Sequence, residues 1–123
     1  MSQILYKDLS YTVVGAAMEV HRILGPGFLE AVYHRALMYE LSLQGVRFEA
    51  FKHLPLSYKG RSVGEYQADL VVEDKMIVEI KAVSRLSACH DAQALHYLAA
   101  TGLRLAILLN FGGTSLEQRR VVR

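Results

Sequence analysis

Hydrophobic positions in the first third of the chain recur every three or four residues, which predicts two helices. The first helix is expected from Leu9 to Leu24. The second is expected from Phe28 to Gln44, and Gly45 is well placed to end it. Because glycine and proline interrupt helices, Gly25-Pro26-Gly27 should separate the two.

From Val46 onward, hydrophobic and polar residues alternate every second position, which is typical of strands. One alternating segment runs from Val46 to Phe51, and a second runs from His53 to Tyr58, where Pro55 indicates an edge strand or a bulge. Two more apolar strands are expected at Tyr66 to Val72 and at Met76 to Val83.

The last third of the chain predicts a helix from Ser87 to Thr101, ended by Gly102, and an apolar strand from Leu103 to Phe111. After the Gly112-Gly113 turn, Gln118 to Val122 is expected as a last edge strand. Local hairpins followed by a helical crossover predict an α/β fold, in which helices pack on the faces of a mixed sheet. The length of 123 residues fits a single domain, 1–123.

The chain is 52% hydrophobic with a formal net charge of +2, which excludes a disordered composition and permits a nucleic-acid partner without requiring one. Three late arginines form either a solvated tail or a phosphate contact: Arg119, Arg120 and Arg123. The single cysteine, Cys89, cannot form an internal disulfide, and neither a signal peptide nor a membrane span is recognisable. A cytoplasmic protein with no membrane association is therefore expected.

Two charged residues interrupt the most apolar strand. Glu79 and Lys81 are the only charged residues between Met76 and Val83, and their spacing of two places them on one face of the strand. Burying a carboxylate and an ammonium group costs several kcal/mol unless each has a partner, which indicates a functional reason for keeping them.

Asp69, the only acidic residue of the preceding strand, is the candidate partner. A three-residue loop of residues 73–75 would pair Val72 with Met76 and place Asp69 opposite Glu79, with side chains starting about 5 Å apart. A two-residue loop would instead place the two carboxylates on opposite faces.

Two carboxylates at that distance repel each other unless a cation lies between them. Carboxylate and carbonyl oxygens suit Mg²⁺ or Mn²⁺, and Lys81 beside such a metal would activate the attacking water or stabilise the transition state. A buried salt bridge without catalysis is the alternative. The five histidines show no zinc spacing, so zinc is not expected.

Further polar side chains share helix faces. Gln93 and Tyr97 lie four residues apart, with His90 on the same side, although an ordinary amphipathic helix would give the same spacing. One face of the second helix carries Glu30, Tyr33 and His34. Glu30 also lies in the first turn, where the helix dipole alone favours an acidic residue.

Several of these residues belong to one ordered pattern. Gly27-Phe28-Leu29-Glu30-Ala31-Val32-Tyr33 matches the string GxxExxY, and Asp69, Glu79-Ile80-Lys81, Gln93 with Tyr97 and the segment 108–112 follow in order. Over nearly the whole chain this pattern resembles the GxxExxY protein family of the PD-(D/E)XK nuclease superfamily. The Gln-x-x-x-Tyr element is similar to that of RecB-like nucleases. Ala68 stands where the superfamily name has proline.

The resemblance implies a restriction-endonuclease-like core, a central mixed β-sheet flanked by helices, and a role for each matching residue. Asp69 and Glu79 would bind the divalent metal, with the carbonyl of Ile80 and, directly or through water, Glu30. Lys81 would assist the hydrolytic water. The candidate substrate-binding residues are Gln93, Tyr97, Tyr33 and His90.

Two functions remain open from the sequence. The first is a metal-dependent nuclease that hydrolyses phosphodiester bonds, with DNA favoured over RNA, acting as a homodimer or with a protein partner for targeting. The second is a catalytically silent module of the same fold that binds nucleic acid or protein. The second reading predicts weak metal affinity and no loss of function when Lys81 is changed.

Overall fold

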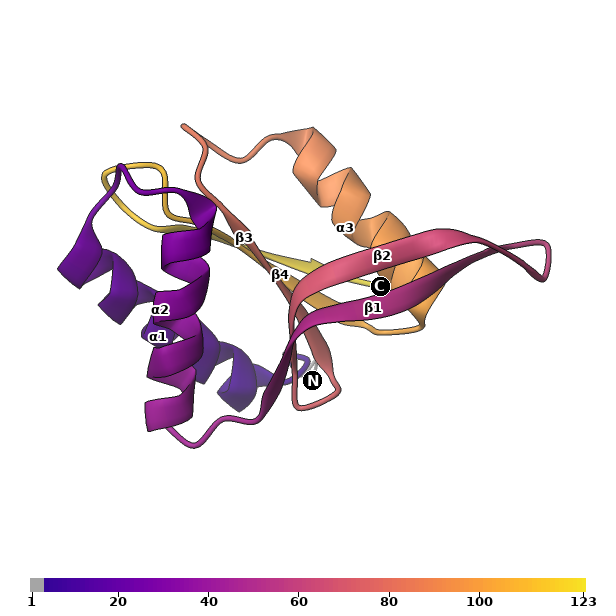
Figure 1. Cartoon of the computed structure of the whole chain (residues 1–123), viewed down its shortest axis with the longest axis horizontal. Coiled ribbons are helices and arrows are strands. Elements are labelled where there is room, and N and C mark those ends of the chain that lie inside the picture. The colour runs from indigo at the N-terminus through magenta and orange to yellow at the C-terminus, as the bar shows by residue number, and fades with distance from the viewer. Residues whose placement is uncertain (1–3) are drawn as a thin grey trace.

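Five strands form one mixed sheet that separates two helical layers (Figure 1). The structure is a computed structural model that describes residues 4–123. In chain order the elements are α1 (Lys7–Leu24), α2 (Glu30–Leu43), β1 (Phe48–Tyr58), β2 (Arg61–Val72), β3 (Met76–Lys81), α3 (Ala88–Thr101), β4 (Leu105–Asn110) and β5 (Glu117–Val122). The predicted fold class is confirmed, since β3 and β4 are parallel and the other neighbouring strands are antiparallel.

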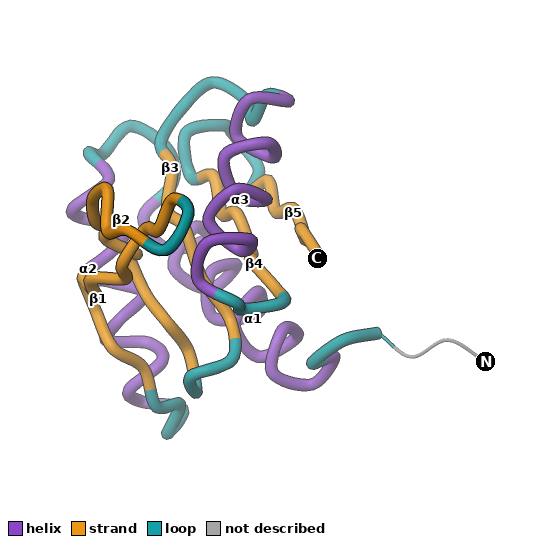
Figure 2. The backbone as a smooth tube through the Cα atoms, turned by 90° about the vertical axis from the view of Figure 1, so that its right-hand side faces the viewer, coloured by secondary structure: helices purple, strands orange, loops and turns teal. Residues whose placement is uncertain are grey.

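Strand β3 lies in the middle of the sheet, and its apolar side chains fill the core on both faces. Met76, Val78 and Ile80 pack with α1 and α2, whereas Ile77 packs with α3. Figure 2 shows α3, which makes the crossover from β3 to β4, lying beside β4 and β5. Because both faces of β3 are covered, its two charged residues are held where helices approach from either side.

The element boundaries differ from the sequence prediction mainly in three strands: β1 and β2 extend through polar residues, and β3 is shorter than expected. β1 is one continuous strand rather than two segments, and β2 begins at Arg61 rather than Tyr66. The residues added to β2, 61–65, are exposed and form the second arm of the hairpin tip, where no hydrophobic alternation indicates a strand. β3 ends at Lys81 because the amide side chain of Asn110 hydrogen-bonds both the N–H and the carbonyl of Val83, at 2.9 and 3.0 Å.

The turn between β2 and β3 has the predicted three-residue length, and Val72 pairs with Met76 as expected. Glu73 and Asp74 adopt left-handed φ angles of 52° and 55°, and the Lys75 N–H donates to the carbonyl of Val72 at 3.0 Å. The tight turn therefore sets the register that brings the second half of β2 alongside β3.

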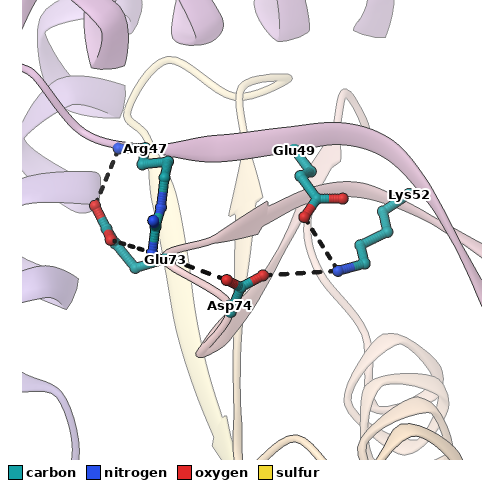
Figure 3. Close-up of polar contacts among 5 residues, drawn as sticks. All are labelled: Arg47, Glu49, Lys52, Glu73 and Asp74. Atoms are coloured by element: carbon teal, nitrogen blue, oxygen red, sulfur yellow. Dashed lines mark hydrogen bonds and ion pairs between the residues drawn. The ribbon is translucent and has the colours of Figure 1, made fainter.

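Charged side chains tie this turn to β1 (Figure 3). The backbone N–H of Arg47 donates to Glu73 at 3.0 Å, and its guanidinium lies 3.3 Å from the same carboxylate. Lys52 lies 3.2 Å from Glu49 and 3.7 Å from Asp74. Because these groups are mostly exposed, each ion pair contributes only about 0–1 kcal/mol.

The β1–β2 hairpin twists sharply at Phe51 and Asp69. The ladder continues on both sides of these two residues but lacks the pair between them, and Phe51 has a left-handed φ of 54°. Leu70 packs with α1 and α2, whereas Ala68, on the same side of an ideal strand, packs with α3. The hairpin thus changes sides at Asp69.

The C-terminal arginines are largely committed to the fold. Arg119 forms an ion pair with Asp91, with Nη1 and Oδ2 2.5 Å apart. Arg120 donates to the hydroxyl of Ser10 at 2.5 Å and to the carbonyl of Leu5 at 2.6 Å. Neither is a free tail residue. Within residues 4–123, no helix is both long and apolar enough to span a membrane.

Candidate active site

A cavity of about 340 Å³ opens where β2 and β3 diverge, and its walls are mainly polar. We call it the polar cavity; it is lined by Glu30, Leu56, Glu65, Tyr66, Gln67, Asp69, Glu79, Ile80, Lys81, Gln93 and Tyr97. The structure therefore brings together all four residues predicted to be catalytic with Ile80, Gln93 and Tyr97.

Asp69 lies at the point where pairing between the strands stops. The ladder ends at Leu70 and Val78, and the next positions in that register are Asp69 and Glu79, as the three-residue loop predicts. Instead of continuing the ladder, Asp69 accepts a hydrogen bond through Oδ2 from the N–H of Ile80 at 2.7 Å. Its carboxylate therefore takes the place of a strand partner and is fixed against β3.

The backbone of Asp69 is anchored from the other side. Nε2 of His34, a buried residue of α2, lies 2.8 Å from the carbonyl oxygen of Asp69. Since a carbonyl oxygen can only accept a hydrogen bond, Nε2 of His34 is the donor. The histidine thus couples α2, which carries Glu30, to the strand that carries Asp69.

Glu79 is almost wholly buried, with 7% of its surface exposed. Burial raises its pKa from 4.5 to about 7, the positive charge of Lys81 opposes this rise, and the negative charge of Glu30 adds to it. The groups around Glu79 therefore supply too little positive charge to stabilise its ionised form. A cation bound beside the carboxylate would supply that charge.

Helix α3 supplies the remaining wall of the polar cavity. Gln93 and Tyr97 both line it, and the Tyr97 ring stacks on Tyr66, with centroids 3.6 Å apart and planes at 11°. Burial and the negative charge of Glu79 raise the pKa of Tyr97, so its hydroxyl stays protonated at neutral pH and can donate a hydrogen bond.

Two predicted substrate-binding residues, Tyr33 and His90, do not line the polar cavity. Tyr33 is fully buried, its hydroxyl donates to the carbonyl of Gly25 at 2.6 Å, and its ring stacks on Phe111. His90 accepts a hydrogen bond at Nδ1 from the N–H of Ser87 in the capping box of α3. Both side chains are engaged in holding local structure.

Sequence reasoning gave no role to three residues that shape this site. Glu65 and Gln67 line the polar cavity, and their alternation with Tyr66 and Ala68 along β2 is a signal that could have found them. Asn110, fully buried, lies in the segment 108–112 of the ordered pattern, but the pattern gave it no role because that role depends on a contact with Val83, far away in the sequence.

The donor atoms suit a hard divalent cation, because carboxylate and carbonyl oxygens are the ligands that Mg²⁺ and Mn²⁺ prefer. Across residues 4–123, no three His, Cys, Asp or Glu side chains already form a cluster that could hold a metal ion. One carboxylate oxygen of Asp69 accepts a hydrogen bond from the N–H of Ile80, and Glu79 lacks compensating positive charge. The residues therefore fit a cation in chemistry, and binding one would draw their side chains together.

Comparison with known protein families identifies the chain. The family model described as the PD-(D/E)XK nuclease superfamily matches residues 7–121. The chain belongs to the PD-(D/E)XK nuclease superfamily. The expected core, with a mixed sheet and flanking helices, is thereby confirmed. The match concerns the superfamily as a whole, so membership of the narrower GxxExxY group stays a prediction.

Two solved structures resemble this PD-(D/E)XK protein in fold. The crystal structure of SSO0001 is 16% identical, with a TM-score of 0.59, and covers 95% of this chain. This chain spans 62% of that protein's length. The alkaline exonuclease LHK-Exo from Laribacter hongkongensis is 13% identical, with a TM-score of 0.46, covering 100% of this chain and 72% of its own. No curated protein matches the sequence significantly.

Proposed function

We propose that the protein is a divalent-metal-dependent nuclease that hydrolyses phosphodiester bonds in nucleic acid. The observation that carries this function is the convergence of Asp69, Glu79 and Lys81 in one polar cavity at the end of the β2–β3 ladder. Superfamily membership supports the same reaction class. The electrostatics of Glu79 add a physical reason for a cation at this position.

The metal would be Mg²⁺ or Mn²⁺, held by Asp69, Glu79, the carbonyl of Ile80 and Glu30. When bound, it would supply positive charge to the phosphate as negative charge develops there. Lys81 would hold the attacking water by a hydrogen bond and add a second positive charge. Gln93 and Tyr97, both donors on α3, would orient the phosphate backbone.

Cleavage assays on labelled single-stranded, double-stranded and branched DNA and on RNA test this function, with Mg²⁺, Mn²⁺ or EDTA. Two variants remove a charged group and keep a side chain of similar size. Asp69→Asn retains an oxygen that can accept the Ile80 N–H, and Lys81→Met retains an apolar stem. Glu40→Gln, on α2 and outside the polar cavity, is the matched control.

We expect metal-dependent cleavage that is lost in Asp69→Asn and Lys81→Met and kept in Glu40→Gln. Loss of at least about a hundredfold in rate fits the removal of a group that acts on the transition state. If folded wild-type protein cleaves no substrate and calorimetry detects no metal binding, the catalytically silent module replaces the nuclease. DNA rather than RNA is the expected substrate.

A homodimer would place two copies of the site on one duplex, related by a two-fold axis. Light scattering on the purified protein measures this directly, since the 13.8 kDa chain would give about twice that mass. A monomer in solution would instead favour targeting by a protein partner.

A further inference from the structure

A second cavity, also of about 340 Å³, adjoins the polar cavity on the side of α2. We call it the apolar cavity, because its walls are mainly carbon atoms, including those of Ala31, Met38 and Phe51. The two cavities share Glu30, Asp69 and Ile80. A molecule that reaches from one to the other therefore passes directly over the candidate catalytic residues.

Phe51 stands at the edge of the apolar cavity in a strained conformation. Its φ of 54° is unusual for a bulky side chain, and 53% of its surface is exposed. Backbone strain of this kind is concentrated at functional sites. An exposed aromatic ring held in that way calls for an explanation other than core packing.

A ring contact with α2 fixes the position of the Phe51 side chain. The Phe51 ring lies 4.5 Å from the His34 ring, centroid to centroid, and His34 is hydrogen-bonded to the backbone of Asp69. The unpaired position in the β1–β2 ladder also sets Phe51 across from Asp69. The aromatic face is therefore positioned relative to the same residue that would hold the metal.

The difference between the two cavities matches the two halves of a nucleotide. A polar cavity beside Lys81 suits a phosphate, and an apolar cavity with an exposed aromatic ring suits a base. Arg35, exposed at the apolar cavity, adds a cation for the base edge or the next phosphate. The volume is at the small end of the range of about 300–1,000 Å³ for ligand pockets.

We propose that the apolar cavity binds one unpaired nucleobase next to the phosphodiester in the polar cavity. The substrate is therefore single-stranded, or locally unpaired, at the cleavage point. This inference rests on the proposed nuclease function, which supplies the phosphate position. A base within an intact duplex is stacked on both sides and cannot enter such a cavity without leaving the helix.

The first arm of the test measures binding without cleavage. All variants carry Lys81→Met, since Lys81 lines the polar cavity and not the apolar one. Phe51→Asn removes the ring while providing a residue that tolerates a left-handed φ, and Phe51→Tyr keeps the ring. Tyr39→Ser removes an aromatic ring that is 68% exposed on α2 and outside both cavities, and serves as the control.

Fluorescence anisotropy with labelled single-stranded DNA gives the affinities. Phe51→Asn should weaken binding by about tenfold to a hundredfold, which corresponds to one lost base–aromatic stack, while Phe51→Tyr and Tyr39→Ser stay within about twofold. Single 2-aminopurine substitutions should report quenching at one position of the strand, and Phe51→Asn should abolish that quenching.

The second arm needs only wild-type protein, Phe51→Asn and Asp69→Asn, and measures cleavage. Single-stranded DNA carrying one abasic position at a time should be cleaved slowly when that position flanks the scissile phosphate. On that substrate, wild-type protein and Phe51→Asn should cleave at equal rates, because the base that distinguishes them is absent.

Each outcome decides between the two claims. If Phe51→Asn binds like Phe51→Tyr, or if abasic positions make no difference, the base-binding cavity is wrong. The nuclease then stands if Asp69→Asn abolishes cleavage. Cleavage of intact duplex as fast as single strands also overturns the cavity. If wild-type protein cleaves nothing, the proposed function fails, and the binding arm still decides whether the cavity takes a base.

Discussion

Replacing Glu79 with glutamine should change how the stability of the metal-free protein depends on pH. The pKa of Glu79 is raised from 4.5 to about 7, first by burial, with Lys81 opposing the rise and Glu30 adding to it. Folded protein therefore binds this proton more tightly than unfolded protein does. The stabilisation is complete below about pH 4.5 and is lost as the pH rises through about 7.

The size of the effect follows from the pKa rise. At about 1.4 kcal/mol for each pH unit, a pKa that moves from 4.5 to about 7 corresponds to about 3 kcal/mol. Wild-type protein should lose this much stability between about pH 4.5 and 8 on account of Glu79. Glu79→Gln cannot ionise, so it should not lose that contribution.

Urea unfolding in EDTA at several pH values between 4.5 and 8 measures this difference. The free energy of unfolding of Glu79→Gln minus that of wild type should rise by about 3 kcal/mol across the range. Any fixed cost of the amide cancels, because only the change with pH is compared. Glu40→Gln, on α2, should run parallel to wild type. Parallel curves for Glu79→Gln as well would refute the electrostatic account of the site.

Two further substitutions test the loop contacts that hold the chain beyond Lys81. Gly112→Ala should destabilise the protein by about 3 kcal/mol or more in urea unfolding, because its new Cβ would lie 2.2 Å from the carbonyl oxygen of Val83. Gly15→Ala is the control, because Gly15 lies at an exposed helix position with no atom within 4 Å of the new Cβ, and it should stabilise the protein by up to about 1 kcal/mol. Equal effects of Gly112→Ala and Gly15→Ala would contradict the close approach of Gly112 to Val83. Asn110→Ala should cost about 1–3 kcal/mol by the same measurement, because the half-buried N–H and carbonyl of Val83 lose the amide of Asn110 as their partner. A loss below about 0.5 kcal/mol would show that water replaces the amide.

The central strands and their register follow from local chemistry that can be read in the sequence. A three-residue turn determines which residue faces which, so the pairing of Val72 with Met76 could be predicted from the loop length alone. The structure adds that Glu73 and Asp74 both adopt the left-handed backbone conformation in this turn. The predicted register was right, although the conformation that produces it was not foreseen.

The remaining features depend on contacts between segments that are distant in sequence. Helical spacing places Tyr33 on the same face as Glu30, but only the packed fold shows that its hydroxyl is bound by the loop at Gly25. Likewise, alternation predicts a strand segment that ends at Phe51, but nothing in the neighbouring residues indicates a left-handed φ at Phe51 itself. Periodicity gives the face of an element, and tertiary packing decides what that face meets.

The twist of the β1–β2 hairpin explains why two unlike cavities meet at one aspartate. If β2 kept its pairing with β3 through Asp69, the N–H of Ile80 would bond to backbone and the Asp69 carboxylate would be free of β3. Ending the ladder there lets the side chain replace the missing strand bond, turns Ala68 toward α3 and leaves Phe51 unpaired and exposed toward α2. The polar cavity, the apolar cavity and the position of the candidate metal ligand thus all follow from the two changes in strand pairing that meet at Asp69. A substitution that straightens the hairpin at Phe51 should therefore affect phosphate chemistry as well as base binding, which is why Phe51→Asn, compatible with the left-handed backbone, separates the two better than alanine would.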